Sequence, residues 1–227
     1  KLIDLIAVFA LLAGTATTFS LATPLLAGAI STVTGIPQST GLTLVILIVV
    51  CAIYTFSVYF GMKGVQLSAA TCTWLFFGLL AYVFFFGGQT RFIIEEGITA
   101  LGNLTQNFIG LATWTDSLRT SSFPQTWTIF YWAYWMVWCV AVPFFIGSIS
   151  KGRTLRQVIL GGYVFGLSGT FTSFIIMGNY GLGLQMHGKL DVLSTYAADG
   201  NLYHAILDIL GQLPLSKAVL VLLVLSM

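Results

Sequence analysis

"GLTLVILIVVCAIYTFSVYFG", residues 41–61, contains 21 residues and not one charged side chain. An α-helix needs about 20 apolar residues to cross the hydrocarbon core of a bilayer, so this stretch has the length and character of a membrane span. The whole chain is similar, because 57% of its residues are hydrophobic and only 7% are charged. Soluble domains carry roughly 25% charged residues, and so little charge cannot cover a surface that faces water. We therefore predict an all-α, polytopic helical membrane protein.

Hydropathy predicts six spans separated by two longer connections. The spans cover residues 3–29, 41–61, 66–86, 125–147, 157–178 and 215–227. Within the first long connection, residues 91–111 place Ile94, Ile98, Leu101 and Phe108 at helical spacing. This pattern is typical of an amphipathic helix that lies at the interface or against the bundle.

The orientation follows from lysine and arginine in the short loops. "SKGRTLRQ", residues 150–157, carries Lys151, Arg153 and Arg156. Because short basic loops stay on the cytoplasmic side, this loop is predicted to be cytoplasmic and both long connections, with the amphipathic helix, outward-facing. We therefore expect a multi-pass protein of the inner (cytoplasmic) membrane, with the lipid bilayer as its surroundings.

Charge and cysteine content exclude several functions. The net charge of +2 is scattered, so no basic patch favours nucleic acid. The three cysteines have no CxxC spacing, and His187 and His204 lie in a polar connection with no third ligand at a usual ligand spacing, so neither a metal nor another cofactor is predicted. The predicted membrane helices offer no catalytic group, and we expect no enzyme activity.

The stretch "FYWAYWMVWC", residues 130–139, has six aromatic side chains in ten positions. Aromatic residues recur at i, i+4, i+7 and i+11 on one helix face: Trp127, Tyr131, Tyr134 and Trp138. Trp135 adjoins this face. Twelve residues extend about 16 Å along a helix, which takes the rings from the outer interface to near the bilayer centre. An interfacial aromatic belt and ordinary packing are the two structural alternatives.

A third alternative is a binding site for a cation. Aromatic ring faces carry negative potential and attract quaternary ammonium groups, which cannot donate a hydrogen bond. Among the predicted spans, the only acidic residue is Asp4, at the end of the first. A carrier of lysine or simple polyamines would place a carboxylate inside the membrane. The aromatic stretch therefore favours a methylated ammonium.

Residues 123–162, "FPQTWTIFYWAYWMVWCVAVPFFIGSISKGRTLRQVILGG", resemble the betaine/choline/carnitine transporter family. The similarity lies in a W-T-x-F-Y-W-A-x-W motif, followed by a cytoplasmic loop of the form I-S-[RK]-G-R-T. Residues 2–21, 85–93 and 212–218 resemble the same family. The resemblance implies that residues 1–227 are a transporter core fragment, from the fifth to the start of the tenth helix of a twelve-helix carrier. The expected fold is part of a five-plus-five inverted-repeat bundle.

The resemblance also implies a substrate site. The family's tryptophan box near the midplane falls on Tyr134, Trp135 and Trp138, with Trp132 and Tyr131 as supporting neighbours. Tyr134 departs from the family's tryptophan and adds a hydroxyl that needs a partner. The other half of the box belongs to the family's fourth helix, which lies outside this chain.

Sodium-coupled members of the family use two threonines at i and i+4 on the fifth helix. This chain has Thr15 at the second place and Leu11 at the first. Thr15 is therefore the candidate cation-binding residue for sodium as a coupling ion. The alternative is that its hydroxyl only bonds its own helix, as membrane threonines commonly do.

The resulting prediction is secondary active transport of a quaternary ammonium compound of the glycine betaine, choline, carnitine or γ-butyrobetaine type, by alternating access. The rival is a ligand-gated channel or sensor that binds a methylammonium ligand without coupled transport. By resemblance, the amphipathic helix at residues 91–111 is a contact between protomers of a homotrimer.

Overall fold

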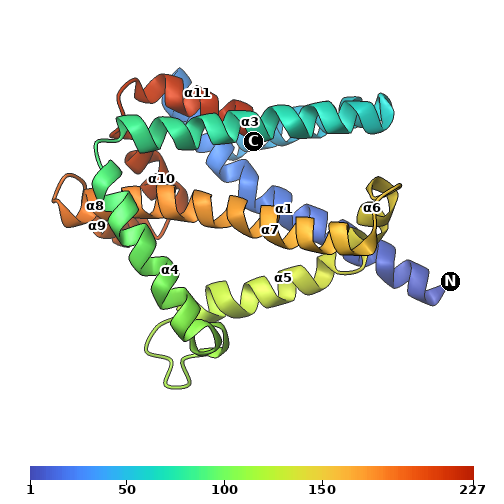
Figure 1. The fold of residues 1–227 in the computed structure, drawn as a ribbon. Helices are drawn as coiled ribbons and strands as arrows, with labels where there is room; N and C mark the ends of the chain where they lie inside the picture. The colour runs from blue at the N-terminus through green and yellow to red at the C-terminus, as the bar shows by residue number, and fades with distance from the viewer. The chain divides into compact units, whose positions relative to one another are not determined.

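The computed structural model describes residues 1–227, apart from the side chains of Ala141 and Asp199. Throughout this described part the regular secondary structure is helical, without a β-strand, which confirms the all-α prediction. Figure 1 shows these helices along the chain, which divides into two compact units. The first contains residues 1–18 and 98–170, and the second contains residues 19–97 and 171–227.

The first unit contains the aromatic stretch. Its helices are the start of α1 (Leu2–Thr34), most of α4 (Thr90–Thr113), the π-helix η1 (Pro124–Ile129), α5 (Phe130–Trp138), α6 (Ala141–Ile149) and most of α7 (Leu155–Ser173). The range 91–111, predicted to be an amphipathic helix, lies within α4. This helix leaves Ile98 and Phe108 exposed and has non-helical backbone angles at Asn107.

The predicted span 125–147 is not one straight helix. Its two parts, Pro124–Trp138 and Val142–Ile149, meet at a bend of 56°. Pro143 accounts for the break, because a proline cannot donate a hydrogen bond to the carbonyl four residues earlier, and its ring clashes with that carbonyl. The affected carbonyl is that of Cys139, where α5 ends.

The second unit contains the rest of the chain. It combines the remainder of α1 with α2 (Thr40–Tyr59), α3 (Gly61–Phe86), the π-helix η2 (Phe174–Gly178), α8 (Asn179–Met186), α9 (Val192–Asp199), α10 (Leu202–Gly211) and α11 (Ser216–Ser226). Ser39 caps α2 by accepting a hydrogen bond from the Leu42 backbone N–H, and Gly61, with a φ of 68°, makes the tight turn into α3.

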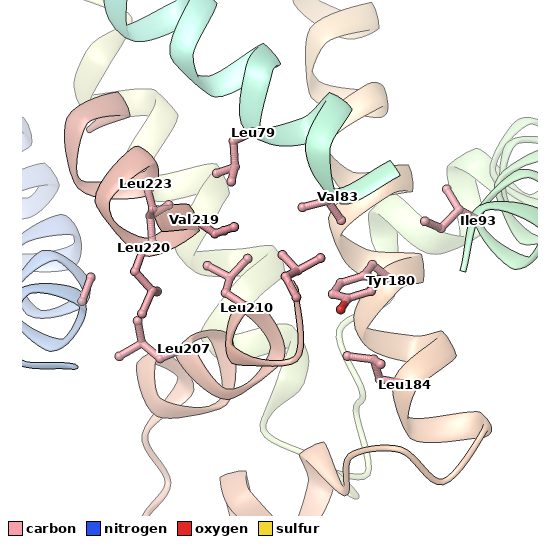
Figure 2. Close-up of a cluster of buried hydrophobic side chains, with 12 residues drawn as sticks. Leu79, Val83, Ile93, Tyr180, Leu184, Leu207, Leu210, Val219, Leu220 and Leu223 are labelled. Carbon is pink, nitrogen blue, oxygen red and sulfur yellow. The ribbon is translucent and has the colours of Figure 1, made fainter. Parts of the chain in front are cut away.

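A cluster of buried side chains holds the second unit together (Figure 2). Leu79 and Val83 of α3 meet Tyr180 of α8, Leu210 of α10 and Leu220 of α11, and each of these side chains is at most 2% exposed. In addition, the Tyr82 hydroxyl donates a hydrogen bond of 2.7 Å to the carbonyl of Pro214, just before α11. These contacts connect α11 to α3 although the two are far apart in the sequence.

Four described helical segments are long and apolar enough to cross a membrane, and the bent pair is a fifth. The four are Leu2–Thr34, Thr40–Tyr59, Gly61–Phe86 and Leu155–Met186. Of the 20 residues of α2, only Ile46 is buried, and outward-facing apolar side chains such as these suit contact with lipid. The sixth predicted span, residues 215–227, contains the 11-residue helix α11. The chain is thus a multi-pass helical membrane protein, whereas the exact set of crossings stays a prediction.

Candidate aromatic substrate site

The aromatic stretch occupies η1 and α5, which form one continuous helical segment. Pro124 stands at the start of η1, where its missing N–H is not needed by the helix. From Phe130 the segment continues as α5 up to Trp138. Because η1 is a π-helix, its turns are wider than those of α5, and such segments occur frequently at functional sites.

One side of α5 contacts the start of α1. The hydroxyl groups of Tyr134 and Thr18 lie 2.6 Å apart. One turn away, Trp138 and Val137 lie against Gly14, where a Cβ atom would stand 3.3 Å from Trp138 Cε2 and 3.1 Å from Val137 Cγ1. Glycine is therefore the residue that permits this approach of the two helices.

The aromatic rings of the stretch pack around Tyr134, three of them at a spacing of three or four residues and Trp135 as its neighbour in the sequence. Around Tyr134, the ring centroids lie 5.9 Å away for Phe130, 6.3 Å for Tyr131, 6.1 Å for Trp135 and 6.4 Å for Trp138. Phe130 stacks on Tyr134, whereas the other three rings meet it edge to face. Such pairs are worth about 0.5–1.5 kcal/mol each beyond their buried area. Tyr134 is thus the centre of the ring network.

The other side of the stretch lines an open hollow of about 490 Å³. The residues around it are Ala112 of α4, Phe123, and five residues of η1 and α5: Trp127, Thr128, Tyr131, Trp132 and Trp135. Trp127 and Tyr131 are stacked at its edge, with ring centroids 6.1 Å apart. The lining is mostly apolar, and five of its seven residues are aromatic.

The structure therefore divides the five predicted substrate residues. Tyr131, Trp132 and Trp135 line the hollow, whereas Tyr134 and Trp138 lie against α1. Whether each residue contacts substrate stays a prediction.

Sequence reasoning missed the two residues that α1 contributes, Gly14 and Thr18. The sequence held only a partial signal for them: both share one face of α1 at i, i+4, and the hydroxyl of Tyr134 needed a partner that the sequence did not identify.

The indole N–H of Trp138 is buried without a hydrogen-bond partner among the described residues. No charged residue occurs within η1 or α5. Because an indole nitrogen can only donate, an acceptor such as a carboxylate oxygen would have to reach this N–H to satisfy it. The segment thus combines ring faces suited to a cation with a donor suited to an anionic or carbonyl group.

Thr15, the candidate sodium ligand, donates its hydroxyl hydrogen to the carbonyl oxygen of Leu11 at 2.9 Å. This is the bond within its own helix that was the alternative to a sodium-binding role. A threonine binds a cation through the lone pairs of its oxygen, which the donated bond does not use. The sodium role of Thr15 stays a prediction.

The loop that leads into η1 is ordered by a buried carboxylate. Asp116, which is 7% exposed, accepts hydrogen bonds from the backbone N–H of Ser121 at 2.7 Å and from the hydroxyl of Thr120. The backbone hydrogen bond from Ser121, followed by those from Thr120, holds the pKa of Asp116 below its usual value. The chain enters the aromatic stretch directly after this loop.

We expect the stability of this loop to depend on pH through Asp116. A carboxylate with a lowered pKa stabilises the fold above its ordinary pKa of about 3.9, and this stabilisation is lost as the pH falls through the lowered value. Asp116→Asn removes the carboxylate charge at every pH and so mimics the protonated state. Amide hydrogen exchange of Ser121 at neutral pH should therefore be several-fold faster in this variant than in the wild type. The matched control is Asp208→Asn at an exposed carboxylate of α10, which should leave Ser121 unchanged. Equal protection of Ser121 in both variants would contradict this role of Asp116.

These features define a class of protein: a multi-pass helical membrane protein with a dense network of aromatic rings on an uncharged helix. Comparison with known families identifies the class further. The family model for betaine/carnitine/choline family transporters (BCCT) matches residues 1–227. The chain therefore belongs to the BCCT family, a family of transporters and not of enzymes, as its sequence predicted.

Two relatives illustrate the similarity. The chain is 31% identical over 216 residues to a probable glycine betaine transporter of Desulfitobacterium hafniense, covering 95% of this chain and 42% of that protein. It is 32% identical over 190 residues to a carnitine transporter of Acinetobacter baumannii, covering 83% of this chain and 34% of that protein. The chain thus spans less than half the length of these relatives.

Proposed function

We propose that the protein containing this chain is a secondary active transporter of a quaternary ammonium compound. It would work by alternating access across the cytoplasmic membrane. Glycine betaine, choline, carnitine and γ-butyrobetaine are the substrates to test. Membership in the BCCT family supports this proposal, as do two relatives named for glycine betaine and for carnitine.

The observation that carries the proposal is the ring network centred on Tyr134. Five aromatic side chains contact one another on a helix without a charged residue. A trimethylammonium group spreads its charge over its methyl groups and donates no hydrogen bond, and aromatic ring faces are suited to such a cation. The free indole N–H of Trp138 suits the carboxylate that betaine and carnitine carry at their other end.

Ion coupling is a separate part of the proposal. Sodium, if it is the coupling ion, would take one oxygen ligand from Thr15, and Leu11 offers only its backbone carbonyl at the preceding turn. A site that lacks one threonine hydroxyl would bind sodium more weakly than a site with two. Uptake measured over a range of sodium concentrations, for the wild type and for Thr15→Val, would show whether sodium acts through this residue.

The assembly proposed for the protein is a homotrimer that uses α4. This helix exposes apolar side chains such as Ile98, Phe108 and Ile109, of which Ile109 is 75% exposed. An exposed apolar face on a helix between two membrane spans suits contact with another protomer. Chemical cross-linking of the full-length protein in membranes would report the number of protomers.

Counterflow in proteoliposomes tests the proposed function directly. The full-length protein is reconstituted, loaded with one unlabelled quaternary ammonium compound, and given the labelled compound outside. A carrier accumulates label transiently above equilibrium, since exchange is faster than net flux. A ligand-gated channel or sensor shows no such overshoot, so equilibration without overshoot for all four compounds would overturn the proposal.

A further inference from the structure

The hydrogen bond between Tyr134 and Thr18 has a defined direction. Thr18 Oγ1 donates its hydrogen to the carbonyl oxygen of Gly14 at 2.9 Å. Its oxygen is therefore an acceptor toward Tyr134, and the tyrosine O–H, 2.6 Å away, is the donor. The hydroxyl hydrogen of Tyr134 is thus engaged by α1 and is not available to a ligand.

The same face of α1 also contacts Trp138. Gly14 and Thr18 are four residues apart on α1, as Tyr134 and Trp138 are on α5. Gly14 provides space beside the indole of Trp138, and its carbonyl accepts the Thr18 hydroxyl that in turn accepts from Tyr134. One short patch of α1, Gly14 with Thr18, therefore contacts two neighbouring rings of α5.

We propose that Thr18 is a positioning residue of the substrate site, which acts through Tyr134. This inference rests on the proposed function. The hydrogen bond from Tyr134 fixes the rotation of its side chain, and the rings that contact Tyr134 are fixed with it. Tyr134 then presents a ring face to the ammonium group instead of a hydroxyl.

Uptake kinetics of four variants of the full-length protein in proteoliposomes test this proposal. Thr18→Val removes the hydroxyl with little change in shape, Tyr134→Phe removes the donor but keeps the ring, and the double variant removes both. Losing a hydrogen bond of ordinary strength should raise the KM for the transported quaternary ammonium compound about 3- to 10-fold in each single variant. The maximal rate should stay unchanged, and the double variant should equal either single one. Thr18→Ser, which keeps the hydroxyl, should retain the wild-type KM.

The matched control is Thr55→Val in α2. The Thr55 hydroxyl, like that of Thr18, donates a hydrogen bond to the carbonyl four residues earlier, that of Cys51 at 2.8 Å. Its replacement by valine should leave the KM unchanged. An unchanged KM in Thr18→Val, or effects that multiply in the double variant, would overturn the positioning role while leaving transport intact. If the wild type exchanges none of the four compounds, the proposed function fails, and the positioning role fails with it.

Discussion

Trp138→Ala in the full-length protein is expected to reduce kcat/KM for uptake of a quaternary ammonium compound by at least about 30-fold. A desolvated cation–π contact is worth about 2 kcal/mol, and every 1.4 kcal/mol corresponds to a factor of ten. The substitution also removes the ring that contacts Tyr134 and the indole N–H that has no described partner. Initial rates of uptake in proteoliposomes over a range of substrate concentrations measure this effect.

Two companion variants separate binding from packing. Trp138→Phe keeps a ring face but loses the indole N–H, so it should retain part of the affinity for the ammonium group. Trp74→Ala, in α3, removes a tryptophan that is 77% exposed and should leave uptake unchanged. Wild-type kinetics in Trp138→Ala would mean that the aromatic stretch serves packing or an interfacial belt.

Gly14→Leu is expected to abolish measurable uptake. A Cβ atom added at this position would lie 3.1 Å from Val137 Cγ1 and 3.3 Å from Trp138 Cε2, both closer than ordinary contacts. The larger leucine side chain would separate α1 from α5, displace Trp138 and break the hydrogen bond between Thr18 and Tyr134. Forcing extra methylene groups into a packed site costs about 1–3 kcal/mol, so the thermal midpoint should fall as well.

Gly166→Leu is the matched control for this variant. Gly166 lies on α7 in the same unit, and a Cβ atom there meets no other atom within 4 Å. Gly14→Ala, which adds one carbon, should show a smaller defect than Gly14→Leu because Val137 and Trp138 need to move only a little. Equal uptake by Gly14→Leu and Gly166→Leu would show that the close approach at Gly14 has no role.

Hydropathy predicted the all-α class in two steps. So few charges place the chain in lipid, and in lipid the backbone N–H and C=O groups must be satisfied within the protein, as they are in a helix. The contacts of Tyr134 with Phe130, Tyr131 and Trp138 could also be predicted, since contacts between residues three or four apart follow from helix geometry alone. In the same way, the spacing of the apolar residues indicated which part of the sequence forms α4.

The break after Trp138 was missed because Pro143 lies inside an apolar run, and hydropathy does not respond to a missing backbone N–H. The division of the predicted substrate residues could not be read from the sequence either. Which rings face α1 depends on how two helices that are distant in sequence approach each other. Gly14 and Thr18 make this approach possible, yet a glycine and a threonine in a membrane helix are too common to indicate it by themselves.

The π-helical turns of η1 have a consequence for comparing this chain with its relatives. In an α-helix each residue turns by about 100°, so removing one residue from the segment before α5 would rotate everything preceding it by that angle. A relative with an ordinary α-helix at this place would then need a one-residue alignment gap within residues 124–129 to keep equivalent rings superimposed. Without that gap, Trp127 would be matched to a side chain that points elsewhere, although the residues from Phe130 onward would still align correctly.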